Sequence, residues 1–289
     1  MASPKKCVIL HLLVKFANNC LTFTKQRQSI TPESINSKSM NNNYGLLAIK
    51  QLIVTFSVAI LCMWLFQLLC SIIFKTSYFA EEISIYSHFV LIMVIILWSY
   101  KKYNMKFLLR KCPLKIMLYC PIIAVLILTC FVYLGTFVRL PNIFQNEMDV
   151  LTESLLGILT LGTLNPIAEE FLFRGILLEN LLKQYKQPWI AIGVSALLFS
   201  LIHFNLAQIP WSFIYGIVLG WIYYKTKTLW PCIIIHTTNN LICCLTAFSP
   251  LGTIIDIAIE KYLLLGLFVI VPICLIPLVY IFGIIYKST

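Results

Sequence analysis

The sequence predicts an all-α membrane protein: a polytopic bundle of about eight transmembrane helices, with both termini on the cytoplasmic side. Hydrophobic residues make up 60% of the 289 residues and charged residues only 11%, whereas soluble domains contain roughly 25% charged residues. Several apolar runs approach 20 residues, the length of a membrane-spanning helix. Lysine and arginine gather in every second connection between these runs, which is the pattern that orients membrane proteins.

Residues 1–45 are predicted to be a polar, disordered N-terminal extension. The stretch from 24 to 43 is rich in Ser, Asn and Gln and lacks the apolar residues that a folded core requires. Met40 stands just before the first strong apolar run, which raises the hypothesis that residues 1–39 lie upstream of the natural start. The membrane-embedded part is therefore expected to begin after residue 45.

The remaining chain divides into three regions that together hold the eight predicted spans. Residues 46–150 hold three, at about 51–74, 83–100 and 116–137. Residues 151–248 hold four, at about 151–182, 189–204, 209–224 and 229–248, and residues 249–289 hold the last, at about 263–286. Short turns join spans four to seven, so these helices are expected to be antiparallel neighbours.

The charges between the spans support this topology. The connection between spans two and three contains only basic charges, and the connections after spans four, six and eight are also basic. The alternate connections are acidic, except that the one between spans five and six is uncharged. The net charge of +11 is therefore interpreted as orientation and contact with anionic membrane lipids, and not as nucleic-acid binding. The basic residues between spans two and three are Lys101, Lys102, Lys106, Arg110, Lys111 and Lys115.

Three charged residues, Glu169, Glu170 and Arg174, lie in the central part of the fourth span, whereas Glu153 and Glu179 lie near its ends. The central three are the only charged residues in the predicted membrane interior, where ionised side chains are costly and usually functional. Glu170 and Arg174 are four residues apart, so they are expected to pair on one helix face. Glu169 points about 100° away and is left for another partner. A structural role for Glu169, hydrogen-bonded to a neighbouring helix, is the alternative.

Two further spans bring polar groups to a similar depth. Span five carries Phe199 and His203, and span seven carries His236 and Asn240, each pair on one helix face. At ~1.5 Å per helical residue, Glu169, His203 and Asn240 lie ~20 Å from the inner ends of their spans. We expect Glu169 to act as a general base on a water held with His203. His236 and Asn240 would donate hydrogen bonds to a developing oxyanion.

A metal site is the second interpretation of the same residues. Glu169, His203 and His236 are ligand types that zinc accepts. The HExxH motif of zinc proteases and the CxxC pairs of structural zinc sites are both absent from the sequence. The sequence leaves open whether water is activated by Glu169 and His203 directly or by a zinc ion held by all three residues.

The order of these motifs resembles the CPBP (CAAX protease and bacteriocin-processing, or Abi) family of intramembrane proteases. The eukaryotic relative in that family is the Ras-converting CAAX prenyl endopeptidase. The resemblance covers about residues 151–248, and no motif position departs from the pattern. The motifs that carry it are Glu169-Glu170-x-x-x-Arg174, Phe199-x-x-x-His203 and His236-x-x-x-Asn240.

The resemblance implies a role for each motif residue. It implies that Glu169 is the catalytic base and His203 its partner in water activation, and that His236 and Asn240 stabilise the oxyanion. Glu170 and Arg174 would form the supporting pair, and Phe199 would pack the site. The family is classed among metalloproteases, while a metal-free mechanism has been argued for members that process prenylated proteins, so zinc stays open.

The resemblance also implies the setting of the reaction. It implies a multi-pass protein of a bacterial plasma membrane that contacts lipids and cleaves a peptide or protein substrate, prenylated or bacteriocin-like. A non-proteolytic bacteriocin-immunity or membrane scaffold protein of the same fold is the alternative. A proton-coupled transporter is disfavoured, because no internal repeat is evident and because Arg174 supplies a counter-charge to the carboxylates.

Overall fold

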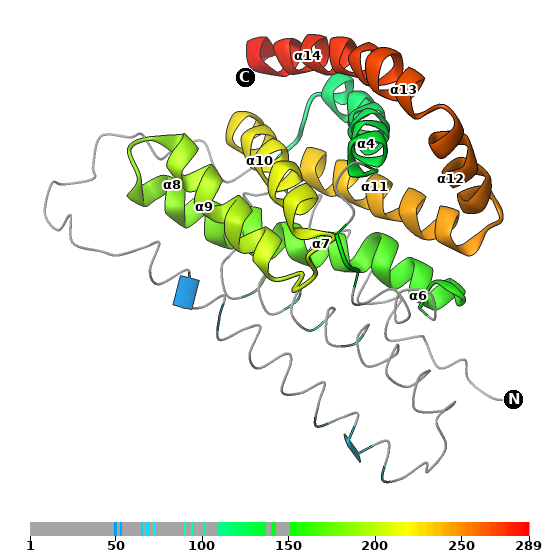
Figure 1. Cartoon of the computed structure of the whole chain (residues 1–289). Helices are drawn as coiled ribbons and strands as arrows, with labels where there is room; N and C mark the ends of the chain where they lie inside the picture. Colours follow the sequence, from blue (N-terminus) through cyan, green and yellow to red (C-terminus); the bar gives the residue numbers. More distant parts are fainter. Residues whose placement is uncertain are drawn as a thin grey trace, which may run out of the picture. The chain divides into compact units, whose positions relative to one another are not determined.

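The computed structural model describes residues 109–136, 140–142 and 151–288, together with isolated positions between 49 and 101. All of them belong to one unit, Asn43–Thr289. Regular structure in the described residues is entirely helical, as the sequence predicts (Figure 1). The elements are α4 (Leu114–Gly135), α6 (Leu155–Leu159), η4 (Thr160–Leu164), α7 (Asn165–Glu170), η5 (Phe171–Leu178), α8 (Glu179–Gln184), α9 (Pro188–Leu201), α10 (Ile209–Thr226), α11 (Trp230–Phe248), α12 (Leu251–Lys261), α13 (Leu263–Leu265), η6 (Gly266–Ile270) and α14 (Val271–Ser288).

Three helical stretches in the described residues are long and apolar enough to cross a membrane. They are Leu114–Gly135, Leu155–Gln184 and Leu263–Lys287, which match predicted spans three, four and eight. A fourth candidate combines α11 with α12 across a bend of 95°. The count of eight stays a prediction, because spans 51–74 and 83–100, like the N-terminal extension 1–45, fall largely outside the described residues.

The fourth span is one continuous helical stretch of three α-helical and two π-helical pieces. The π-helical segments η4 and η5 lie on either side of α7, the six-residue α-helix that ends in the two glutamates. Pro166 lies in the first turn of α7 and has no N–H to donate to the carbonyl four residues earlier. The wider turns of η4 directly precede this break in the hydrogen-bond ladder, and such π-helical turns are frequent at functional sites.

Span five is shorter than the sequence predicts. The predicted helix covers 189–204, whereas α9 ends at Leu201 and Phe204 adopts a left-handed backbone conformation with φ of 47°. This conformation is incompatible with a continuing right-handed helix. The buried Asn205 fixes the turn: its amide donates to Oδ1 of Asn142 at 2.7 Å, and its backbone carbonyl accepts from the first residues of α10.

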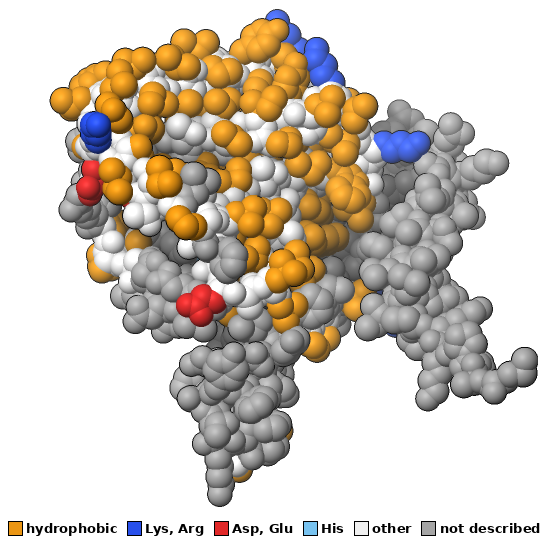
Figure 2. All heavy atoms as spheres, turned by 90° about the vertical axis from the view of Figure 1, so that its right-hand side faces the viewer, with side chains coloured by type: hydrophobic (Ala, Val, Ile, Leu, Met, Phe, Trp, Pro, Cys, Tyr) orange, Lys and Arg blue, Asp and Glu red, His pale blue; other side chains and the backbone are white. Residues whose placement is uncertain are grey.

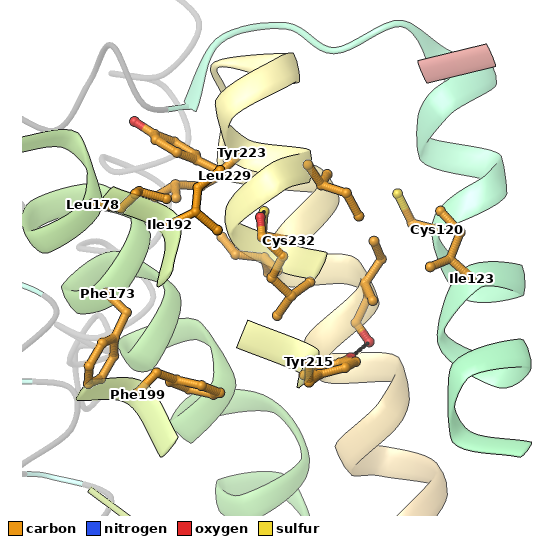
Figure 3. Packing of buried hydrophobic residues seen from close by; sticks show 14 of the residues in the cluster. Cys120, Ile123, Phe173, Leu178, Ile192, Phe199, Tyr215, Tyr223, Leu229 and Cys232 are labelled. Carbon is orange, nitrogen blue, oxygen red and sulfur yellow. Dashed lines mark hydrogen bonds between the residues drawn. The ribbon is translucent and has the colours of Figure 1, made fainter. Parts of the chain in front are cut away.

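The buried core lies between these helices. Helix α9 packs along α10, and α11 packs against α4, η4 and α7. Figure 3 shows part of this core, in which Phe173 and Phe199 lie side by side. The outer surfaces of α12–α14 expose large apolar side chains instead, and Figure 2 shows a face on which hydrophobic side chains predominate. An exposed apolar surface of this extent is expected where lipid replaces water.

Gly266 in η6 provides a test of this packing. A Cβ at this position would collide with the ring of Tyr133 on α4, whereas a Cβ on Gly283 in α14 would meet no atom within 4 Å. We therefore expect Gly266→Ala to destabilise the protein by ~1–3 kcal/mol through overpacking. Gly283→Ala, the matched control, should leave stability unchanged or raise it. Thermal unfolding of the detergent-solubilised variants measures both, and equal melting temperatures would contradict the packing of η6 on α4.

Candidate active site

The two adjacent glutamates at the end of α7 occupy different environments. The Glu170 side chain is fully buried, whereas the Glu169 side chain keeps 23% of its surface exposed. Consecutive residues on a helix point about 100° apart, so one carboxylate can face the packed interior while its neighbour faces an accessible space. The structure therefore separates two chemically identical groups by their surroundings.

Glu170 is held by two charge-bearing partners on a single oxygen. Its Oε1 accepts a hydrogen bond from Nη1 of Arg174 at 2.8 Å and another from Nδ1 of His236 at 2.7 Å. The pair with Arg174 is the one that the four-residue spacing predicts. The bond to His236 joins residues 66 positions apart and was not predicted. Glu170 thus connects the fourth span to α11.

The orientation of the His236 ring follows from this bond. A carboxylate can only accept, so Nδ1 of His236 carries the proton in the bond to Glu170. The opposite nitrogen, Nε2, then faces Oε2 of Glu169 at 3.8 Å, which exceeds hydrogen-bond length. His236 therefore lies between the two glutamates, bonded to one and directed toward the other.

Phe199 forms the aromatic centre of the site. The guanidinium carbon of Arg174 lies 4.4 Å from the centre of the Phe199 ring, a cation–π arrangement. The same ring contacts His203 and His236 edge-on, with ring centroids 5.2 and 5.7 Å away. Phe199 is buried and also packs against Phe173. Its ring therefore lies beside Arg174, His203 and His236, the three residues of the site that can carry a positive charge.

His203 lies outside the helix that was expected to carry it. It belongs to the turn after α9, and its Nδ1 contacts the backbone carbonyl of Phe199 at 2.9 Å. Because a carbonyl accepts, Nδ1 carries a proton, and Nε2 is left as the nitrogen that a ligand can reach. In the described part of the chain, His203 joins the cluster through the backbone and ring of Phe199, and no contact with Glu169 is present.

Asn240 lies one turn after His236 on α11, and its side chain contacts the backbone of the fourth span. Its amide nitrogen donates to the carbonyl of Leu161 in η4 at 3.3 Å, and its oxygen accepts from the amide of Asn239 at 3.3 Å. A primary amide carries two N–H donors, so one remains for a ligand. The packing of α11 on η4 thus places Asn240 beside the π-helical turn.

The zinc set considered from the sequence does not fit this arrangement. Among the described residues, no three His, Cys, Asp or Glu side chains are positioned to hold a metal ion. Glu169 and His236 lie close to each other. His203 instead contacts the backbone of Phe199, and in the described part of the chain it forms no hydrogen bond or ion pair with Glu169 or His236. Three converging ligands are the minimum for a catalytic zinc site.

Sequence analysis missed two features of the site. Tyr215 of α10 packs edge-on against the imidazole of His236, with ring centroids 5.6 Å apart. Asn165, one turn before Glu169, has a buried Oδ1 without a hydrogen-bond partner among the described residues. A tyrosine in the middle of an apolar span was the available signal for the first, because its buried hydroxyl needs a hydrogen-bond partner.

The fold and the site define an integral membrane protein with a charged and aromatic cluster buried among its spans. Residues 151–242, about a third of the chain, match the family model of the type II CAAX prenyl endopeptidases described as Rce1-like. The chain therefore contains a domain of the Rce1-like CAAX prenyl endopeptidase family, and all seven motif residues lie within it. No curated protein and no solved structure shows significant similarity to the chain.

The ion pair at the centre of the site should be important for stability. Arg174→Met keeps most of the side-chain volume but removes the cation beside the buried Glu170 carboxylate. We expect a loss of ~3–5 kcal/mol, the usual effect of breaking a buried pair. Lys183→Met is the control, because its 3.9 Å pair with Glu179 is half-exposed and such pairs contribute at most ~1 kcal/mol. Melting temperatures in detergent that fall equally in both variants would contradict the prediction.

Proposed function

We propose that this protein is an intramembrane endopeptidase that hydrolyses a peptide bond with a water activated by Glu169. The family match supports a peptidase with a peptide substrate. The observation that carries the mechanism is the contrast between the glutamates: Glu170 is buried and bonded to two partners, whereas Glu169 is partly exposed and directed at Nε2 of His236. Of the two glutamates, only Glu169 is exposed enough to contact an incoming substrate.

The 3.8 Å gap between Oε2 of Glu169 and Nε2 of His236 suits a shared small ligand. A water beside this gap can hydrogen-bond to both atoms, and Nε2 of His203 is the third polar group proposed to hold it. Glu169 takes a proton from the water as the new carbon–oxygen bond forms on the scissile carbonyl. The same proton then passes to the leaving amine nitrogen as the carbon–nitrogen bond breaks.

His236 donates to the oxyanion only when it carries a second proton on Nε2, because its Nδ1–H is committed to Glu170. The imidazole is then cationic, and the buried Glu170 carboxylate is its counter-charge. The remaining N–H of Asn240 is the proposed second donor.

The composition of the site favours catalysis over a purely structural role. A scaffold or immunity protein has no evident need for a buried carboxylate and arginine beside a second, partly exposed carboxylate among apolar helices, where charges are costly. No comparison supports the bacteriocin-immunity alternative, and the family match points to a peptide substrate. We propose a substrate whose cleaved segment reaches membrane depth, a requirement that a lipid-modified peptide meets.

Substitution of the proposed base tests this function. Glu169→Gln keeps the shape of the side chain but cannot accept a proton, so we expect cleavage to fall by ~10²–10⁴-fold, as does loss of general-base catalysis elsewhere. His203→Ala and His236→Ala should abolish cleavage as well. Hydrolysis of a prenylated CAAX peptide by purified, folded protein is the measurement, and Glu153→Gln, an exposed glutamate, is the control. Full activity of Glu169→Gln would disprove the mechanism.

We further propose that the chain has eight spans with both termini in the cytoplasm, as the alternation of basic and acidic connections indicates. Green fluorescent protein fused after Thr289 should therefore fluoresce in a bacterial host, since it folds only on the cytoplasmic side. Alkaline phosphatase fused after residue 145, in the acidic connection before the fourth span, should be active, since it requires the opposite side. The reverse pattern would contradict the orientation.

A further inference from the structure

Two consecutive residues of α10 contact the two partners of Glu170. Tyr215 touches His236, and Gly216 touches Arg174. We propose that Tyr215 and Gly216 are positioning residues that hold His236 and Arg174 against Glu170 and so align Nε2 of His236 with Glu169. This proposal rests on the function proposed above, but it assigns work to α10, a helix that carries none of the family motifs.

Tyr215 fixes His236 at two points. Its hydroxyl donates to the backbone carbonyl of Ile235, the residue directly before His236, at 3.1 Å (Figure 3). Its ring meets the imidazole edge-on, at an interplanar angle of 72°. Phe199 meets the imidazole at 80°. With Tyr215 buried and both rings in contact, the imidazole has little freedom to turn away from Glu170.

Gly216 acts through its backbone and through its lack of a side chain. Its carbonyl oxygen lies 3.5 Å from Nη2 of Arg174, on the side of the guanidinium away from Glu170. A Cβ at this position would lie 3.0 Å from Cα and Cβ of Ala196 and 3.3 Å from Cδ1 of Phe199. Glycine therefore allows α10 to approach α9 closely, and this approach brings the carbonyl to Arg174.

The contacts of Tyr215 with His236 and of Gly216 with Arg174 affect the same atom, Oε1 of Glu170. Arg174 and His236 both donate to Oε1 of Glu170. A shift of either donor therefore changes the two hydrogen bonds at that oxygen, and with them the direction in which Nε2 of His236 points. In the described part of the chain, neither α10 residue forms a hydrogen bond or ring contact with Glu169. Their loss should therefore lower kcat with little change in KM, because the alignment of reacting groups is affected and substrate binding is not.

A graded series of variants tests the proposal on the full-length protein in detergent, with cleavage of a prenylated CAAX peptide as the assay. Tyr215→Phe keeps the ring and loses the hydroxyl, and kcat should fall ~10-fold. Tyr215→Leu loses both contacts, and Gly216→Ala displaces Phe199 and the carbonyl; each should lower kcat ~100-fold, the usual effect of a misplacement of about 1 Å. KM should stay within about twofold.

Matched controls lie on the same helix. Tyr223 also donates its hydroxyl, to Glu179 at 2.8 Å, but far from the site. A Cβ on Gly220 would meet Cγ2 of Ile192 at 3.1 Å, a crowding similar to that at Gly216, but its nearest atoms belong to Ile192 and Leu178 and to no residue of the site. Tyr223→Phe and Gly220→Ala should therefore keep kcat within about twofold. Equal losses in the control and the test variants would overturn the proposal, since they would show a general packing effect.

A measurement that does not need activity separates this proposal from the proposed function. The nuclear magnetic resonance signal of the ¹⁵N-labelled His236 imidazole should shift in Tyr215→Phe, and it should stay unchanged in Tyr223→Phe. If the wild-type protein cleaves no peptide, the proposed function fails while this comparison still decides the role of Tyr215. An unchanged His236 signal together with wild-type kcat in Tyr215→Leu would overturn the positioning role.

Discussion

The structure of the site depends on one oxygen atom. Oε1 of Glu170 accepts hydrogen bonds from Arg174 on its own span and from His236 on α11. A carboxylate buried so completely requires partners of opposite charge, and both bonds fall on Oε1, since Oε2 has no hydrogen-bond partner among the described residues. Those partners can be supplied only if α7, η5, α10 and α11 keep their mutual positions. The packing of four elements is therefore coupled to the charge balance of a single side chain.

The π-helical segments explain how one span serves several partners. They lie on both sides of α7, and each takes part in a contact to another helix. In η4 the carbonyl of Leu161 accepts from Asn240 of α11. In η5 Arg174 reaches Glu170 on one side and the carbonyl of Gly216 on the other. Irregular backbone at membrane depth is tolerated where neighbouring helices satisfy the released groups, and here those groups connect the helices around the site.

Local spacing predicted the contact within one helix, but it did not predict the bond between Glu170 and His236 on different helices. The Glu170–Arg174 pair and the helices of spans three, four and eight follow from periodicity and length. The Glu170–His236 bond depends on how two helices are rotated about their axes. The sequence of neither helix determines this rotation by itself. His203 was placed inside a helix because the hydrophobic run continues to Phe204. The turn after α9 is instead held by a part-buried bond between Asn205 and Asn142, 63 positions apart.

Glu169 and Glu170 differ for the same reason that the charged cluster is costly, namely the weak screening of charges in an apolar site. In a site lined by Phe199, Tyr215 and apolar helices, electrostatic interactions are screened far less than in water. A carboxylate there is either neutralised by fixed partners, as Glu170 is, or it remains reactive toward any proton that reaches it. Glu169 has no fixed hydrogen-bonding partner among the described residues, and its one close polar neighbour is itself held by Glu170. The chemistry proposed for Glu169 therefore depends on Glu170, which determines which nitrogen of His236 faces Glu169.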